Sequence, residues 1–382
     1  MIRRLVVLDF GFDSVRQLFA AMPAEVEVIA LTPVSPGRSA REMLHNFRTV
    51  RKNEFRAANC HERRFMIPGW SRFYNASSAL VDKRLRPVLG APEETAIIYI
   101  FPQYARVAER HQDYLQIYFA VDPYTHYEWN AESVRRWEKT LHEACRGSLA
   151  VSRKLCDDFV QAGAKNVAKI SNAVADYFLK DSAAEQFRPA NLPPADRLLV
   201  GCTGNINDTY DWEFIGELAR TCPDVDFVFV GPLYESDPAK LAQIRNVLSR
   251  PNIRHIGPCS HQELPRYLKH FDVCMNPLRV NEHNHRRSPL RLYDYLASGH
   301  YILSTDIAEA ADHEPFVKIV RNGGEAAAFL RGINKGDVPA HRHEMRNYIS
   351  QQTWRHRASE FLRQVHLLNQ AGTGAASAAV HT

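Results

Sequence analysis

Short apolar runs and longer amphipathic stretches alternate along this chain of 382 residues. Six apolar runs of the first half are rich in β-branched or aromatic residues: 3–10, 26–33, 95–102, 116–123, 147–152 and 167–174. Runs of this length and composition predict strands. The stretches between them, such as 131–145 and 152–163, repeat apolar residues at helical spacing. Strands that alternate with helices indicate a mainly parallel sheet covered on both faces.

A polar segment at 180–197 interrupts this alternation and holds three of the 21 prolines, which predicts a linker. After it, strand-like runs at 198–208, 225–232, 252–259, 272–278 and 300–305 again alternate with helical patterns. These runs end in glycine, proline or polar residues. Open parallel sheets bind ligands at the edge where such strands end.

The pattern therefore predicts an α/β fold with two Rossmann-like domains that face each other across a cleft, and a C-terminal helix that closes back. The predicted parts are an N-terminal domain, a linker, a C-terminal domain, the closing helix and a disordered low-complexity tail, at 1–179, 180–197, 198–345, 346–370 and 371–382.

One helix of the second half begins in a basic segment, "RRSPLRLYDYLASG" at 286–299. Ser288 is a suitable N-cap, Pro289 suits the first helical position, and Gly299 can end the helix. The free N–H groups of a helix start attract anions. Arg286, Arg287 and Arg291 add full charges there. These residues alone fit either an anion site or a solvated basic loop before an ordinary helix.

Composition narrows the class of protein without naming an activity. Hydrophobic residues make up 45% and charged residues 24% of the chain, and the formal net charge is +5. No apolar run reaches about 18 residues, and the N-terminus lacks the features of a secretory signal. The seven scattered cysteines form no CxxC pair. We therefore expect reduced thiols and a cytoplasmic protein. No nucleic-acid-binding motif accompanies the basic residues.

Four pieces of the second half resemble the nucleotide-sugar domain of glycosyltransferases with the two-domain GT-B fold. They are "GCTGNIND…DW" (201–212), "PDVDFVFVGP" (223–232), the stretch 252–278, and "SPLRLYDYLASGHYILSTD" (288–306). Pieces of the first half at 117–124 and 147–174 are similar to bacterial exopolysaccharide glycosyltransferases, including the xanthan glucuronosyltransferase-like group.

The resemblance implies that a nucleotide diphospho-sugar binds the second domain. The family's basic residue at the diphosphate falls on Arg291, and its ribose-contacting residue falls on Asp294, beside Tyr293. The turn of Gly204 and Asn205 is expected to approach the donor with backbone groups. We expect uridine as the nucleoside of the donor, and this expectation comes from the family resemblance alone. From the residues alone, Asp294 fits equally an i, i+3 pair with Arg291, and Gly204 a plain tight turn.

The chain departs from one feature of many retaining members, which carry two glutamates eight positions apart. Eight residues before Asp294 stands Arg286. We therefore expect an inverting mechanism, in which Arg286, Arg287 and Ser288 help to hold the diphosphate without a metal or other cofactor. His283 and His285 have no nearby thiol or acidic cluster, so the sequence predicts no metal site.

Inverting sugar transfer needs a base that deprotonates the acceptor hydroxyl. The resemblance places this base at Asp122, which follows the strand-like run 116–121. Alternatively, the sequence Asp122-Pro123 simply forms a turn. The weaker candidates on the acceptor side are His126, Glu128, Gly11 and the aspartates that flank it, Asp9 and Asp13.

The stretch 38–64 is basic, with Lys or Arg at 38, 41, 48, 51, 52, 56, 63 and 64 against acids at 42, 54 and 62. Aromatic residues follow it. This composition fits docking to an anionic membrane, on the inner face of the plasma membrane, and a saccharide acceptor carried on polyprenyl pyrophosphate. It fits a solvated helical face equally well.

The leading hypothesis is thus a hexosyl- or glucuronosyltransferase of surface polysaccharide synthesis. A nucleotide-sugar epimerase on the same fold is a second hypothesis, and the basic acceptor-side stretch argues mildly against it. A non-catalytic relative that binds a nucleotide sugar or a membrane is a third. The missing acidic pair keeps that third hypothesis open.

Overall fold

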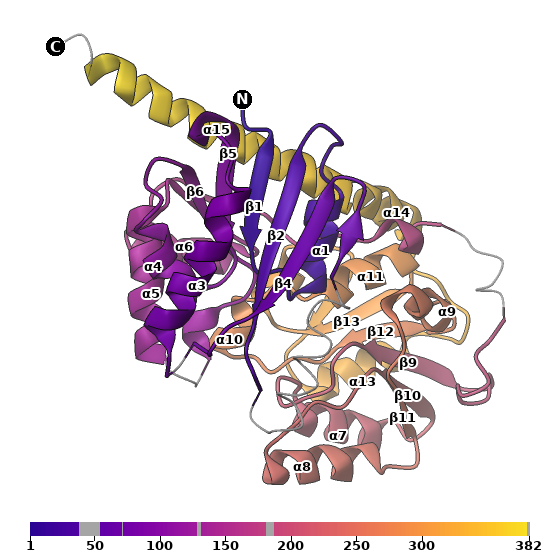
Figure 1. Cartoon of the computed structure of the whole chain (residues 1–382). Coiled ribbons are helices and arrows are strands. Elements are labelled where there is room, and N and C mark those ends of the chain that lie inside the picture. The colour runs from indigo at the N-terminus through magenta and orange to yellow at the C-terminus, as the bar shows by residue number, and fades with distance from the viewer. Residues whose placement is uncertain (38–53, 71, 128–130, 181–186, 380–382) are drawn as a thin grey trace. The chain divides into compact units, whose positions relative to one another are not determined.

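The computed structural model describes residues 1–37, 54–70, 72–127, 131–180 and 187–379, and Figure 1 shows its course. The chain divides into two compact units. Unit 1 comprises Met1–Asn172, Arg286–Ser288 and Trp354–Thr382, and unit 2 comprises Ala173–His285 and Pro289–Thr353. Each unit is an α/β body around a parallel sheet, which confirms the predicted fold class. The division after Asn172 lies earlier in the chain than the predicted linker.

The sheet of unit 1 has the strand order β3-β4-β2-β1-β5-β6-β7-β8. Its strands are β1 (Arg4–Leu8), β2 (Glu27–Val34), β3 (Arg56–Ala57), β4 (Cys60–Met66), β5 (Thr95–Tyr99), β6 (Leu115–Ala120), β7 (Gly147–Ala150) and β8 (Val167–Lys169). All neighbours pair in parallel except β3 and β4. Every residue of β5 and β6 is buried, because these apolar strands are covered on both faces.

Helices of unit 1 cover this sheet (Figure 1). They are α1 (Asp13–Ala20), α3 (Tyr74–Leu85), α4 (Ala105–Ala108), α5 (Ala131–Ala144), α6 (Arg153–Gln161) and α15 (Trp354–Ala379). Short 3-10 turns lie at η1 (Arg86–Val88), η2 (Pro92–Glu94), η3 (Pro102–Tyr104) and η4 (Tyr124–His126).

The C-terminal helix α15 returns to unit 1, as the sequence predicts for a closing helix. Phe361 of α15 packs edge-to-face on Phe19 of α1, with ring centroids 5.2 Å apart. The helical backbone continues to Ala379, into the low-complexity tail. Within the described ranges, no helix combines the length and apolarity needed to cross a membrane.

Strand β4 lies in the basic stretch, where no strand was predicted. Cys60 and Glu62 of β4 are buried, while His61 and Arg63 are exposed. This alternation places the charges of the described part on a strand, so the alternative of a solvated helical face is wrong there. The strand escapes prediction because a buried glutamate replaces an apolar residue in its period-two pattern. The rest of the stretch, 38–53, lies outside the described residues.

The sheet of unit 2 has the order β11-β10-β9-β12-β13-β14, all parallel. The strands are β9 (Leu198–Thr203), β10 (Val225–Val230), β11 (Ile253–Gly257), β12 (Val273–Asn276), β13 (Tyr301–Thr305) and β14 (Val317–Val320). Numbered within the unit, this is the doubly wound order 3-2-1-4-5-6. The order reverses between β9 and β12, and ligands bind such sheets at the carboxyl ends beside this switch point.

The helices of unit 2 surround its sheet (Figure 1). They are α7 (Trp212–Thr221), α8 (Pro238–Leu248), α9 (Leu264–Leu268), α10 (Glu282–His285), α11 (Leu290–Ser298), α12 (Ala308–Ala311), α13 (Gly323–Arg331) and α14 (Arg342–Ser350). Two 3-10 turns, η5 (Asp176–Phe178) and η7 (His261–Glu263), belong to the same unit.

Helix α11 is the helix predicted from the basic segment. Gly299 ends it in the left-handed conformation with φ 70°, as predicted. The prediction of Ser288 as N-cap is wrong, because Pro289 occupies that position. The backbone of Ser288 is held elsewhere: its carbonyl accepts a hydrogen bond from Asn172 Nδ2 at 2.5 Å. The helix therefore starts at Leu290.

Candidate functional site

The carboxyl ends of β9, β10 and β11 meet at two glycines of unit 2. Gly204 has φ 109° and donates its N–H to Val230 O at 3.0 Å, while Gly231 has φ 152° and donates to Gly257 O at 2.8 Å. A Cβ on Gly231 would lie 1.9 Å from the carbonyl oxygen of Gly204. Only glycine permits this backbone approach. It fixes the turn of Gly204 and the exposed Asn205 at the edge where the sheet binds ligands.

Arg291, in the first turn of α11, reaches this turn. Its guanidinium carbon lies 4.6 Å from the centre of the Tyr210 ring, and Nη1 lies 3.6 Å from Cys202 Sγ. A Cβ on Gly204 would sit 3.2 Å from Arg291 Nη2. No carboxylate within the described ranges forms an ion pair with this partly buried cation. A cation withdrawn from water without a counter-ion is costly, so the geometry favours an anionic ligand.

Asp294 lies one turn further along α11 and is 2% exposed. Its Oδ2 is 3.0 Å from His261 Nε2, and the other ring nitrogen of His261 is hydrogen-bonded to the hydroxyl of Tyr177. Burial raises the pKa of Asp294, and the hydrogen bond with His261 lowers it in part. Its Oδ1 is buried without a hydrogen-bond partner. The ion-pair partner of Asp294 is thus His261 rather than Arg291, and one oxygen remains able to accept a hydroxyl.

Sequence reasoning missed His261 and Tyr177. His261 opens the turn η7 directly after the "GPCS" segment, and Tyr177 belongs to η5 near the start of unit 2. His261 lies within the family-like stretch 252–278, but no residue pattern there marks it as a site residue, and Tyr177 lies outside the four pieces. Only the pairing of elements far apart in the chain brings them to Asp294.

Tyr293 faces away from this edge and into the core. It is 1% exposed, and its hydroxyl donates to Glu309 Oε1 at 2.7 Å. Its ring packs edge-to-face on His313. We assign Tyr293 to packing and leave it out of the candidate site.

Arg286 and Arg287 belong to unit 1, whereas Arg291 belongs to unit 2. Arg286 binds Asp158 through two nitrogens, with Nη2 3.1 Å from Oδ1, and Ser152 Oγ donates to the carbonyl of Arg286 at 2.7 Å. Arg287 Nε lies 3.3 Å from Asp122 Oδ1. Both cations are therefore paired with carboxylates of their own unit. The structure does not gather the three predicted arginines in one unit.

Asp122 follows β6, as predicted, and is 8% exposed. Its Oδ1 meets Arg287, and its Oδ2 accepts a hydrogen bond from the Tyr127 hydroxyl. His126 lies nearby in η4, with Nε2 3.8 Å from Asp158 Oδ2. Glu128 lies outside the described residues. Both oxygens of Asp122 are thus engaged by its own unit.

Asp9 follows β1 and differs from Asp122 in its partners. Gly11 N–H donates to its Oδ1 at 3.0 Å, and the Tyr104 hydroxyl donates to its Oδ2 at 3.1 Å. No cation in the described part of the chain forms an ion pair with it. Burial raises the pKa of Asp9 to about 6, because the lowering by these two hydrogen bonds is smaller. Its φ of 86° is unusual for a residue other than glycine, and such strain is often found at functional sites.

Gly11 was a weak acceptor-side candidate, and the structure gives it a definite contact. A Cβ at this position would lie 3.1 Å from Asp9 Oδ1. The glycine thus leaves room for the carboxylate that its N–H binds.

Potential metal ligands do not cluster in the described ranges, where no group of three or more His, Cys, Asp or Glu side chains could hold an ion. His283 and His285 lie on the short helix α10, and His285 Nδ1 accepts a hydrogen bond from the N–H of Ala308 at 3.2 Å.

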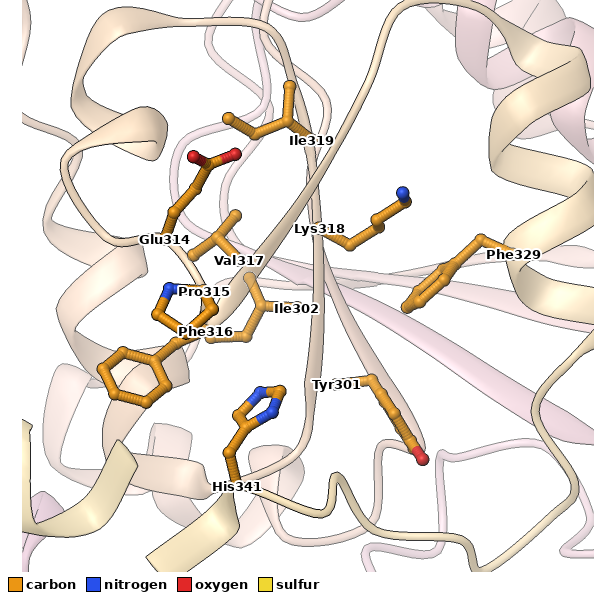
Figure 2. A pocket seen from close by; sticks show the side chains of 10 residues that line it. All are labelled: Tyr301, Ile302, Glu314, Pro315, Phe316, Val317, Lys318, Ile319, Phe329 and His341. Atoms are coloured by element: carbon orange, nitrogen blue, oxygen red, sulfur yellow. The ribbon is translucent and has the colours of Figure 1, made fainter. Parts of the chain in front are cut away.

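A hollow of about 400 Å³ lies elsewhere in unit 2, along β13 and β14 (Figure 2). Tyr301, Phe316 and Phe329 contribute rings to its lining. Tyr301 and Val317 are the first residues of their strands, so the hollow reaches the amino ends of the sheet. None of the predicted site residues lines it. The candidate donor site is therefore the opposite, carboxyl edge.

Comparisons with known proteins show which proteins this chain resembles. Residues 211–363 match the family model described as glycosyl transferase-like. The putative teichuronic acid biosynthesis glycosyltransferase TuaH of Bacillus subtilis (strain 168) is 25% identical over 207 residues, which cover 53% of this chain and 51% of TuaH. The match thus spans about half the length of this curated relative.

Solved structures are similar over nearly the whole chain. Sucrose-phosphate synthase from Thermosynechococcus elongatus has a TM-score of 0.74 at 14% identity, covering 97% of this chain and 100% of that one. Anabaena Alr3699/HepE in complex with UDP and glucose has a TM-score of 0.65 at 14% identity, covering 99% and 100%. These likenesses show that the chain has the GT-B fold.

Proposed function

We propose that this chain is a glycosyltransferase that transfers a sugar from a nucleotide diphospho-sugar to a saccharide acceptor, which the partial family match, the relative TuaH and the GT-B fold support. A uridine nucleotide is the first candidate donor, since similar structures hold UDP-glucose or UDP. The donor site proposed here lies in unit 2, at the carboxyl edge of β9.

Arg291 is the single observation that carries this proposal. Its guanidinium is withdrawn from water, stacks on Tyr210 and has no carboxylate partner among the residues that the structure describes. A diphosphate supplies the missing negative charge, and arginine can bind it through two nitrogens. Arg291 also lies in the first turn of α11, where the helix dipole favours anions. As the sugar leaves, the same groups stabilise the charge that develops on the diphosphate.

Two further features extend the proposed donor site. The partnerless Oδ1 of Asp294 can accept a hydrogen bond from a ribose hydroxyl. The glycine turn at Gly204 and Asn205 lets a phosphate approach the backbone closely. Arg286, Arg287 and Ser288 are paired within unit 1, so we assign them to positioning the segment before α11 rather than to direct diphosphate contact.

An inverting transfer is the proposed mechanism. The acceptor hydroxyl attacks the anomeric carbon, the bond to the diphosphate oxygen breaks, and a carboxylate takes the hydroxyl proton. Asp122 is the base suggested by the family resemblance. Asp9 is a second candidate and the one we favour, because a pKa of about 6 suits a base near neutral pH and it forms no ion pair with a described residue.

The acceptor and the location are further parts of the proposal. The printed description of TuaH, teichuronic acid biosynthesis, supports a role in surface polysaccharide synthesis of the exopolysaccharide type. We propose a saccharide acceptor, carried on polyprenyl pyrophosphate, and peripheral binding to an anionic membrane. A hexosyl or a glucuronosyl donor fits equally well.

The first test is a titration of the purified protein with UDP, GDP and their common sugar derivatives, followed by calorimetry and thermal shift without added metal. We expect one nucleotide to bind, and Arg291→Ala to weaken its binding at least tenfold through the lost charge-assisted hydrogen bonds. Arg287→Ala is the matched control and should keep the affinity. Equal losses in both variants would contradict the assignment of the diphosphate to Arg291.

Two other functions stay open and have separate signatures. A nucleotide-sugar epimerase would interconvert donors without an acceptor, which a donor-only incubation analysed by chromatography detects. A non-catalytic relative would bind the nucleotide but release none of it as product in the presence of acceptors. Binding followed by acceptor-dependent release of nucleoside diphosphate supports the transferase.

A further inference from the structure

A small pocket of unit 2 lies at the other end of α11. Its volume is about 70 Å³. Helices α9 and α14, which line it, both pack against α11 (Figure 1). Its lining comprises Phe178, Lys180, Pro265, Leu268, Lys269, Ala297, Ser298, His300, Arg342 and Arg346. Because α11 rises 1.5 Å per residue, about one nanometre of helix separates Arg291 from Ala297 and Ser298, which line this pocket.

Four cations and no carboxylate line this pocket: Lys180, Lys269, Arg342 and Arg346. For Lys180, Lys269 and Arg342, the described residues supply no ion pair or side-chain hydrogen bond. The C-terminus of α11 brings about half a negative charge to the same place. That partial charge explains one nearby cation, and Arg342, which lies over Gly299, fills this role. Lys180, Lys269 and Arg346 add further positive charge at the same place, beyond what the helix end offsets, and the two lysines are exposed.

His300 also lines the pocket. Burial, with a smaller contribution from the charge of Arg342, lowers the pKa of His300 to about 4. Asp272 acts in the opposite direction and His270 in the same one. The ring is therefore neutral at pH 7 and offers hydrogen-bonding nitrogens without another charge.

The larger hollow of unit 2 differs from this pocket in the charges of its lining residues (Figure 2). It contains one acid and one lysine, Glu314 and Lys318, beside aromatic and aliphatic side chains. Those charges can offset one another, so that hollow has no preference for an anion. The small pocket is smaller by more than fivefold, and all four of its charged lining residues are cations.

We propose that this pocket, between α9, the C-terminal end of α11 and α14, binds a phosphate group. The volume accepts a small oxyanion and excludes a sugar ring or a nucleotide, whose pockets are several times larger. Lysine and arginine donors surround such an anion with charge-assisted hydrogen bonds. Either a free phosphate or phosphate monoester, or the phosphate of a lipid head group, presents this chemistry. The site does not depend on the proposed transferase reaction.

The test is a titration of the full chain with inorganic phosphate at constant ionic strength, followed by calorimetry. The Arg291→Ala variant serves as background, so that phosphate in the proposed donor site does not contribute. We expect saturable binding, roughly fivefold weaker after Lys269→Ala and weaker again after adding Lys180→Ala. Arg220→Ala removes an exposed cation of α7, outside the pocket, and should leave the affinity unchanged.

Two further measurements identify the source of the phosphate. The imidazole signals of His300, followed by NMR, should titrate at a higher pH when phosphate is bound. Vesicles of phosphatidylglycerol, with phosphatidylcholine vesicles as the uncharged control, present the same group on a lipid. Lysine-dependent binding to vesicles but not to free phosphate assigns the pocket to a head group, and the reverse assigns it to a soluble phosphate. No lysine-dependent binding in either arm would overturn the proposal.

Discussion

Arg287 and Arg291 lie four residues apart in one basic segment, yet their environments differ completely. Arg287, like its neighbour Arg286, is paired with a carboxylate of unit 1. Arg291 stacks on Tyr210 in unit 2, where the described residues offer it no carboxylate. A charge that the protein neutralises itself holds the fold together. A withdrawn charge that the protein leaves uncompensated is available to a ligand.

The carboxylates of unit 1 show the same contrast. Asp122 is engaged by Arg287 and Tyr127, whereas Asp9 has only hydrogen bonds from Gly11 and Tyr104. Burial raises the pKa of Asp9 to about 6. This contrast supports the proposal that Asp9 is the base and that Asp122 positions Arg287, and each expectation below tests that proposal.

The largest effect is expected from removing the proposed base. Asp9→Asn keeps the shape of the side chain but cannot accept the proton, so the turnover should fall by about 10² to 10⁴-fold. The affinity for the nucleotide should not change. The rate of nucleoside diphosphate release with acceptor, measured beside calorimetric donor binding, checks both statements.

Asp122→Asn is the matched control for this variant. It should lower turnover less, and it should also lower the thermal midpoint, because Arg287 loses its partner. A larger loss of turnover in Asp122→Asn than in Asp9→Asn, with both proteins folded, would return the base to Asp122.

Gly231→Ala should disturb the donor edge of unit 2. The new Cβ would overlap the carbonyl of Gly204, so we expect a loss of about 2 kcal/mol or more in unfolding free energy, together with weaker nucleotide binding. Gly257→Ala meets the same left-handed strain, at φ 87°, but no atom within 4 Å. Thermal melts and nucleotide titrations of the two variants distinguish the steric overlap with Gly204 from the cost of a positive φ alone. Equal behaviour would argue against the close backbone approach.

The pH dependence of the rate should carry the signature of Asp9. A base with a pKa of about 6 loses activity as pH falls through that value, so the acid limb of kcat/KM should lie near pH 6. The hydrogen bond from Tyr104 lowers this pKa, and Tyr104→Phe should therefore move the limb to higher pH. Rate profiles between pH 5 and 8 in both proteins check the direction. If the acid limb lies at the same pH in Tyr104→Phe as in the unaltered protein, the ionisation of Asp9 does not produce it.

Ser152→Ala should have the smallest effect. Ser152 caps α6 by accepting the N–H of Leu155 at 3.2 Å and also donates to Arg286 O. Losing a helix cap costs about 1 kcal/mol of stability. The thermal midpoint should fall slightly, while nucleotide affinity stays the same, because Arg286 belongs to the paired set. A marked loss of nucleotide binding would show that the segment before α11 matters to the donor.

Local pattern alone determined most of the fold. Eleven of the strands in the described residues coincide with predicted apolar runs, and most of these are inner strands of a parallel sheet, which are buried on both faces. The helix that begins at Leu290 and ends at Gly299 was visible too, although its N-cap lies one residue later than predicted. The position of Arg291 in the first turn of that helix was therefore readable from the sequence.

The tertiary structure decided which charges are compensated. Neither the pairing of Arg286 with Asp158, 128 residues earlier in the chain, nor that of Asp294 with His261 has a local signal. β4 stayed hidden because a charged residue, Glu62, occupies an inward position. The left-handed backbone of Asp9 has no local signal either, and its raised pKa arises from burial in the folded unit. Sequence pattern reports which face of an element is buried, whereas the function of a charge depends on partners that only folding brings within reach.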